Sequence, residues 1–122
     1  ESFPINTKTL PALPQRAEME QEKEALRRIM SDLVGVTRDD AGLTRALRLI
    51  DAMYAISVMR DTRFADMLLT ARLITLSALR RTESRGGHYR GDYPKAKKIW
   101  QRRSFLTLSG HDVAAPAREY VA

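Results

Sequence analysis

The chain has 122 residues, 43% hydrophobic and 30% charged, which suffices for one folded globular domain and is unlike the composition of a disordered segment. It contains no cysteine, so disulfides, thiolate chemistry and cysteine-based zinc sites are excluded. Lys and Arg exceed Asp and Glu by six, a balance that on its own indicates an anionic partner.

The first residues, 1–14, contain three prolines and no sustained apolar periodicity. Because proline prevents a continuous helix, this segment is predicted to be an extended linker from something upstream. Its first residues lack the basic start and apolar middle of a signal peptide. The apolar runs of the chain are only a few residues long, whereas a membrane span needs about 20. We therefore expect a cytoplasmic protein.

Three stretches have the apolar spacing of amphipathic helices. The first covers residues 15–34 and stops at Gly35, the second runs from Asp39 or Asp40 to residue 58, and the third runs from Asp61 or Thr62 to residue 82. Connections of four or five residues favour antiparallel neighbours. The predicted fold is therefore all-α: an antiparallel three-helix bundle, spectrin-repeat-like, followed by a Gly-rich loop and an extended C-terminal tail.

The residues expected to face the bundle interior share helical spacing within each stretch. They are Met19, Leu26, Ile29, Met30 and Leu33; then Leu43, Ala46, Leu47, Ile50, Met53, Tyr54 and Ser57; then Phe64, Met67, Leu68, Ala71, Ile74, Thr75 and Ala78. Methionine adapts to irregular gaps. All five methionines, including Met59, are therefore predicted to fill the core.

The helical periodicity ends after Thr82, where residues 83–94 contain three glycines and a proline. This composition predicts a loop with a fixed path. Residues 99–100 and 104–108 are predicted to be short extended pieces. The expected division is a linker at 1–14, the bundle with its docking loop at 15–94, and a basic extended tail at 95–122.

A family resemblance appears in this loop. Residues 78–94 read Ala-Leu-Arg-Arg-Thr-Glu-Ser-Arg-Gly-Gly-His-Tyr-Arg-Gly-Asp-Tyr-Pro, which resembles the signature near the C-terminus of the succinate dehydrogenase and fumarate reductase flavoproteins. Within that superfamily, residues 30–38 and 43–49 resemble L-aspartate oxidases, and the match spans residues 24–108. Succinate dehydrogenase flavoproteins share the loop but typically read Gly-Ala-His and carry a different tail.

The resemblance implies the C-terminal helical domain of an FAD-dependent L-aspartate oxidase, which converts L-aspartate to iminoaspartate on the way to quinolinate and NAD. The parent enzyme would bind FAD through a Gly-rich fingerprint that this chain lacks. The resemblance therefore implies that residues 1–14 are the linker from a missing upstream flavin domain. The family's catalytic residues belong to its flavin and capping domains, so we expect no catalytic, cofactor-binding or metal-binding residue here and an inactive fragment.

The resemblance also implies the partners of this domain. They are the flavin-binding and capping domains of the same parent chain, with quinolinate synthase as a further partner and with neither nucleic acid nor membrane. Two alternatives stay open. One is the C-terminal domain of a succinate dehydrogenase or fumarate reductase flavoprotein; the other is an independent basic helical module that binds nucleic acid or an acidic protein.

Charged residues of the loop could imitate an active site. His88 lies near acidic and basic neighbours, but the second histidine is 23 residues away, so structural hydrogen bonding is favoured over catalysis or metal binding. Glu83 and Arg85 could clamp a dicarboxylate, but around a Gly-Gly turn they can equally satisfy the loop and one another. The residues predicted to dock this domain are Glu83, Ser84, Arg85, Gly86, Gly87, His88, Arg90 and Asp92.

Positive charge is concentrated after the third helix. From Arg80 to Arg103 there are nine Lys or Arg against two acidic residues. With Trp100 and Phe105 nearby, this run resembles a nucleic-acid surface, but a solvated or domain-facing surface is favoured because few aromatic residues interleave it.

Overall fold

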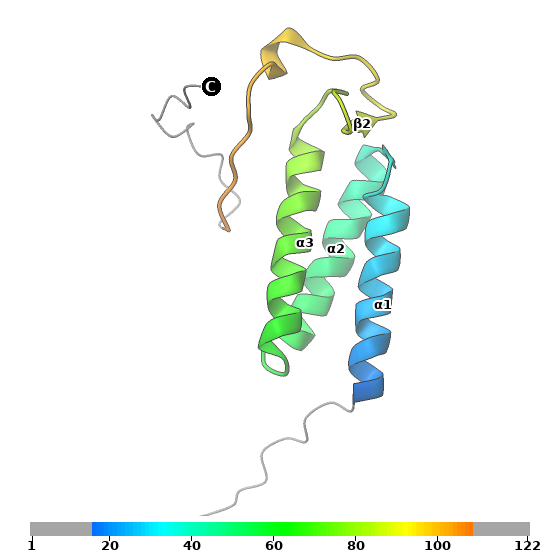
Figure 1. Cartoon of the computed structure of the whole chain (residues 1–122), viewed down its shortest axis with the longest axis vertical. Helices are drawn as coiled ribbons and strands as arrows, with labels where there is room; N and C mark the ends of the chain where they lie inside the picture. Colours follow the sequence, from blue (N-terminus) through cyan, green and yellow to red (C-terminus); the bar gives the residue numbers. More distant parts are fainter. Residues whose placement is uncertain (1–15, 109–122) are drawn as a thin grey trace, which may run out of the picture.

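Three long helices dominate the computed structural model, which describes residues 16–108. Helix α1 is Arg16–Leu33, α2 is Asp40–Ser57 and α3 is Thr62–Arg80. They lie side by side along the long axis, and the colours of Figure 1 show that α1 and α3 ascend in this view whereas α2 descends. The prediction of a mostly helical chain is confirmed, and each helix limit lies within two residues of its predicted place. The predicted linker at 1–14 and residues 109–122 of the tail lie outside the described residues.

Capping residues and one glycine define where these helices begin and end. The carboxylate of Asp39 accepts the backbone N–H of Gly42 at 2.7 Å, and Asp61 accepts that of Arg63 at 3.0 Å. Such contacts satisfy helix N–H groups that have no partner within the helix. At the end of α1, a Cβ on Gly35 would lie 2.2 Å from the carbonyl oxygen of Ser31. Only glycine fits where the chain leaves this helix.

Buried apolar side chains from all three helices form two adjoining core clusters, and α2 and α3 pack together most extensively. Burying one such side chain contributes about 1.5 to 3 kcal/mol. The first cluster is Leu26, Ile50, Phe64, Leu68 and Ala71; the second is Val34, Leu43, Ala46 and Ala78.

Three residues predicted for the core are exposed. Met59 is 89% exposed because it lies in the turn after α2, where no helix faces it. Met67 and Ile74 are nearly half exposed. Apart from Ala65, the buried residues of α3 recur at alternating steps of four and three from Phe64 to Ala78, and Met67 and Ile74 fall beside that stripe. Met30 and Met53 pack against the core as predicted.

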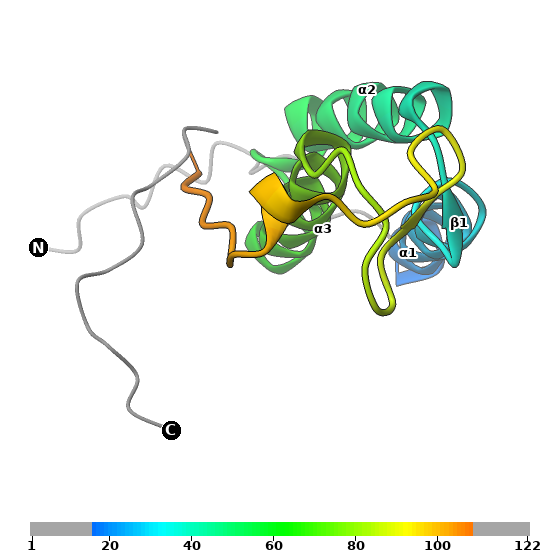
Figure 2. The same cartoon turned by 90° about the horizontal axis from the view of Figure 1, so that it is seen from above.

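The segment after α3 crosses the loop end of the bundle, where α1 and α3 end and α2 begins (Figure 2). Two very short strands, β1 at Thr37–Arg38 and β2 at Tyr89–Arg90, pair in parallel there. The extended structure predicted for residues 99–100 is wrong, because Lys98–Trp100 forms the 3-10 helix η1, in which the Gln101 N–H donates to the Lys98 carbonyl at 3.0 Å. None of the described helices is long and apolar enough to cross a membrane.

Candidate functional site

A tight hairpin turn forms the tip of the loop. The backbone N–H of Arg85 donates to the carbonyl of His88 at 2.7 Å, and that of His88 donates to the carbonyl of Arg85 at 3.0 Å. Between them, Gly86 has φ +55°, the left-handed conformation that side chains disfavour. Gly87 has no positive φ, and a Cβ at its position would meet no atom within 4 Å. Of the two glycines in this turn, only Gly86 therefore needs the backbone freedom that glycine provides.

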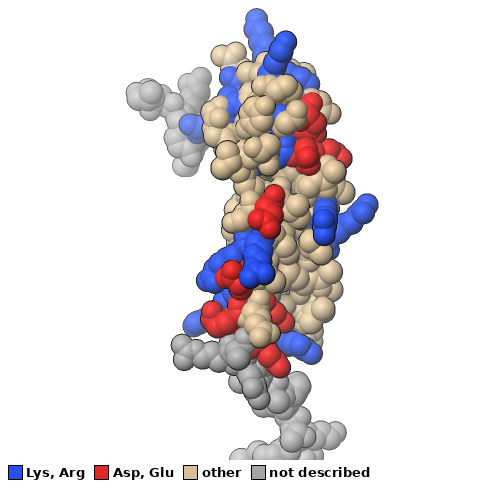
Figure 3. Space-filling view, turned by 90° about the vertical axis from the view of Figure 1, so that its right-hand side faces the viewer, with Lys and Arg blue, Asp and Glu red and all other residues tan. Residues whose placement is uncertain are grey.

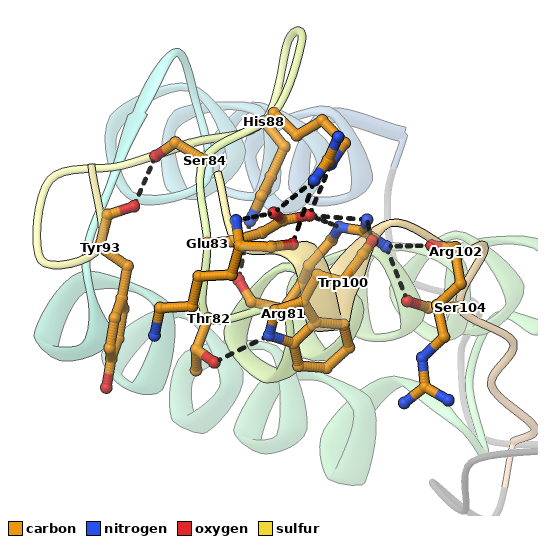
Figure 4. Close-up of polar contacts among 11 residues, drawn as sticks. Arg81, Thr82, Glu83, Ser84, His88, Tyr93, Trp100, Arg102 and Ser104 are labelled. Atoms are coloured by element: carbon orange, nitrogen blue, oxygen red, sulfur yellow. Dashed lines mark hydrogen bonds and ion pairs between the residues drawn. The ribbon is translucent and has the colours of Figure 1, made fainter. Parts of the chain in front are cut away.

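Glu83 is the centre of the polar network shown in Figure 4, and its side chain has no exposed surface. Its Oε1 accepts from Arg81 Nη2 at 2.7 Å and from Arg85 Nε at 3.0 Å. Its Oε2 accepts from Arg85 Nη2 at 3.2 Å and from the backbone N–H of Lys97 at 2.8 Å. These donors, Arg85 first among them, lower the pKa of Glu83 from 4.5 to about 2. The carboxylate is therefore ionised and fully engaged at neutral pH.

His88 is held by both of its ring nitrogens. Nδ1 lies 2.8 Å from Arg38 Nη1, and Nε2 lies 2.9 Å from the carbonyl oxygen of Arg81. A guanidinium only donates and a carbonyl only accepts, so Nδ1 must accept and Nε2 must carry the proton. Burial first, and the nearby arginines second, lower the pKa of His88. His88 is therefore a neutral structural residue with no free nitrogen for proton transfer.

Ser84 and Arg90 close the second half of the loop. The Ser84 hydroxyl accepts the backbone N–H of Arg90 at 2.9 Å and donates to the carbonyl of Tyr93 at 2.7 Å. The fully buried guanidinium of Arg90 forms two parallel bonds with Asp92, 2.8 Å from Nε to Oδ1 and 2.7 Å from Nη2 to Oδ2. This bidentate pair lowers the pKa of Asp92 from 3.8 to about 2.

Side chains around the loop also cap one end of each helix. Arg90 Nη1 donates to the carbonyls of Ala78 and Leu79 at the end of α3, at 3.0 and 2.8 Å. Asp92 accepts the backbone N–H of Asp40, 2.9 Å away at the start of α2. Arg38 Nε donates to the carbonyls of Val34 and Gly35, the two residues that directly follow α1, at 3.1 and 3.0 Å. His88 joins this set because it donates to the carbonyl of Arg81, the residue that caps α3, and accepts from Arg38. We call the four side chains of Arg38, His88, Arg90 and Asp92 the helix-end clasp.

The chemistry of this arrangement is structural. Each clasp side chain is bound within the chain, and within residues 16–108 no three His, Asp or Glu side chains gather where a metal could bind. A helix N-terminus is the usual place for a dinucleotide pyrophosphate, but Asp39 and Asp92 occupy that of α2 and Asp61 that of α3. Carboxylates of this chain therefore already bond to the free N–H groups at the starts of α2 and α3.

All eight residues of the predicted docking set lie at this end of the molecule, and the structure brings the charged ones together in pairs. Sequence reasoning missed Arg38 and Arg81, which complete the network. Arg81 donates to Glu83 and to the carbonyl of Trp100. Arg38 lies 50 positions before the ring that it contacts, so no local pattern could identify it. For Arg81, the available signal was its position two residues before Glu83.

Comparison with known proteins places the loop in a family. The model of the fumarate reductase flavoprotein C-terminal region matches residues 23–119. An L-aspartate oxidase of Caulobacter vibrioides is 39% identical over 119 residues, which are 98% of this chain and 20% of that protein. An L-aspartate oxidase of Rhodospirillum rubrum is 47% identical over 79 residues, covering 65% of this chain and 28% of the relative.

A solved structure agrees with these matches. The Sdh1 complex of Mycobacterium smegmatis in the apo form contains a chain similar to this one, with a TM-score of 0.61 and 30% identity, covering 77% of this chain and 19% of that chain. The chain thus spans between a fifth and just over a quarter of the length of the two L-aspartate oxidases. On the family match and these similarities, this chain belongs to the fumarate reductase flavoprotein C-terminal family.

Proposed function

We propose that this chain is the C-terminal helical domain of an FAD-dependent L-aspartate oxidase, a cytoplasmic enzyme that oxidises L-aspartate to iminoaspartate for NAD biosynthesis. The observation that carries the proposal is the similarity of nearly the whole chain to an L-aspartate oxidase. FAD and the reacting residues would belong to the rest of the parent enzyme. In this proposal the helices form an antiparallel, spectrin-repeat-like bundle, and the domain is inactive alone.

The proposed role of the domain is to dock on the flavin-binding and capping parts of its parent. Two observations support this role. The charged groups of the loop bind one another and the helix ends, so they fix the shape of the loop. The hairpin tip at Gly86 and Gly87 and the ring of Tyr89 stay exposed, and loops with a defined path commonly form binding surfaces.

The test is to express the parent polypeptide and measure its flavin absorption and its turnover with L-aspartate and with succinate. We expect bound flavin and oxidation of L-aspartate. Bound flavin with oxidation of succinate alone would favour the second candidate, the C-terminal domain of a succinate dehydrogenase flavoprotein, which the likeness to the Mycobacterium smegmatis chain supports. The absence of flavin would contradict both.

Substitutions separate docking from catalysis. In the parent enzyme, Arg85→Ala removes the two hydrogen bonds that Arg85 donates to Glu83. It also removes the bond from Arg85 Nη2 to the carbonyl of Lys97, 3.1 Å away. The loosened loop should lower the melting temperature and flavin retention, while turnover per bound flavin and its pH dependence stay unchanged. His88→Ala should behave alike. If either variant keeps normal stability and flavin yet loses turnover about a thousandfold, the loop reaches the active site.

A further inference from the structure

Residues 95–103, which we call the basic strap, contain five Lys or Arg and no acidic residue. The two acidic residues of this region are already used, Glu83 by Arg81 and Arg85 and Asp92 by Arg90. Within residues 16–108 no carboxylate pairs with the strap residues Lys95, Lys97, Lys98 and Arg102. Figure 3 shows Lys and Arg side chains projecting from this end of the molecule.

The backbone of the strap is anchored through its carbonyl groups. The Lys95 carbonyl accepts the backbone N–H of Ser84 at 3.3 Å, and the Lys97 carbonyl accepts from Arg85 at 3.1 Å. Arg81 donates to the carbonyls of Trp100 and Arg102. Because these oxygens bond to the loop and the end of α3, the strap is held in one path along the surface.

An exposed apolar side chain lies among these cations. Ile99, in the short helix η1, is 73% exposed, and its neighbours Lys97 and Lys98 are exposed as well. Protein interfaces commonly have an apolar centre surrounded by a polar rim, and Ile99 with its lysine neighbours has this arrangement.

The aromatic residues argue against nucleic acid as the partner. Single-stranded nucleic acid binds basic surfaces by stacking its bases on free aromatic rings. Here the Trp100 ring has the guanidinium groups of Arg81 and Arg102 at 5.5 and 5.8 Å from its centre. The Tyr93 ring has Arg90 at 5.1 Å and Lys97 at 4.6 Å. Both rings are engaged by cations of this chain, so neither is a free stacking platform.

We propose that the basic strap docks on an acidic protein surface with an apolar recess for Ile99, and that this surface belongs to the rest of the parent flavoprotein. This inference rests on the proposed function. The chain spans only about a fifth of its Caulobacter relative, so most of such a parent lies outside this domain. Because opposite charges attract across an interface, the expected partner of the strap is an acidic surface on that other part of the parent.

The test compares two strap variants of the parent polypeptide, Lys95→Glu/Lys98→Glu and Ile99→Ser. Two controls make an equal change of charge, or remove another exposed apolar side chain, elsewhere: Arg45→Glu/Arg48→Glu on the exposed side of α2, and Met59→Ser in the turn between α2 and α3. The readouts are the rate at which thermolysin releases the domain, in low and high salt, and the melting temperature of the separate 122-residue chain.

We expect each strap variant to speed release by thermolysin on the order of tenfold in low salt, with less effect of the charge variant in high salt, and the controls to match the unaltered protein. The melting temperature of the separate chain should stay unchanged. Strap variants that behave as the controls would overturn the strap proposal, whereas the proposed function would still stand on the flavin and turnover of the parent. Quenching of Trp100 fluorescence by single-stranded DNA at about 0.15 M salt would also overturn it, in favour of nucleic acid.

Discussion

A carboxylate without exposed surface is unfavourable unless its charge is compensated, and Glu83 meets this condition through Arg81, Arg85 and one backbone N–H. The same reasoning explains His88, whose pKa is lowered first by burial and then by repulsion from three nearby arginines, so the ring is neutral. Both residues have the side chains of catalytic groups, yet all their polar atoms are bound. At the scale of single residues, these two side chains hold the loop in a fixed conformation.

The first prediction concerns acid stability. Because the pKa of Glu83 falls from 4.5 in the unfolded chain to about 2 in the folded one, its contribution is present above pH 4.5 and is lost as the pH falls towards 2. Asp92 acts in the same direction. Glu83→Gln should lower the melting temperature at pH 7 by about 10 °C and flatten its decline below pH 4.5. Melting curves from pH 2 to 8 test this, with the exposed Glu24→Gln as control; an unchanged slope would contradict it.

The second prediction concerns the protonation of His88. Its folded pKa is lowered from 6.5, so His88 stabilises the fold above pH 6.5, and this contribution is lost as the pH falls from 6.5 towards the folded pKa. Nuclear magnetic resonance of ¹⁵N-labelled protein should find the proton on Nε2 at pH 7 and a titration midpoint below 6.5. A midpoint at or above 6.5, or a proton on Nδ1, would show that the contact with Arg38 is misassigned.

At the scale of the elements, the helix-end clasp links the three helices through their termini. The carbonyls at the end of a helix lack partners within it, and Arg38 and Arg90 provide donors for α1 and α3. Asp92 joins the start of α2 to the guanidinium that caps α3. One substitution in the clasp therefore affects more than one helix.

The third prediction follows from this arrangement. Arg90→Ala should destabilise the domain by about 2 to 4 kcal/mol, because it leaves Asp92 and two helix carbonyls without their donor. Arg48→Ala, at an exposed position on α2, should change stability by no more than about 0.5 kcal/mol. Urea denaturation of both variants measures the difference. Equal midpoints would mean that water replaces the guanidinium without loss.

The helices could be predicted from sequence because their signals are local. Core residues recur every three or four positions, and Asp39 lies before α2 as a cap, so limits were correct within two residues. The pairing of Thr37 with Tyr89 was not predictable, because two-residue strands have no periodicity and lie 52 positions apart. For the site, the charged residues of the loop could be singled out from the sequence. Their hydrogen-bond partners could not, because these include carbonyls at the end of α3 and the side chain of Arg38, which no local pattern connects to the loop.

The fourth prediction concerns the whole molecule. One core that joins three helices should give the separate chain a helix-dominated circular dichroism spectrum and a single cooperative thermal transition. The purified chain should be colourless and should form no peroxide with L-aspartate, because it lacks the Gly-rich FAD fingerprint and carboxylates occupy the N-termini of α2 and α3. A flavin absorption band, or a spectrum dominated by strand or coil, would contradict this prediction.

The helix-end clasp also has a consequence for how the domain folds. Consecutive helices meet after short turns, but the clasp joins residues such as Arg38 and His88 that are 50 positions apart, and closing so long a loop is slow. We expect the helices to pack first and the clasp to form after the transition state. Arg90→Ala should then accelerate unfolding and leave the folding rate nearly unchanged, which stopped-flow measurements across a urea series can establish. Slower folding of the variant would place the clasp in the nucleus. With the clasp forming late, it determines how long the folded domain survives and has little influence on how fast it forms.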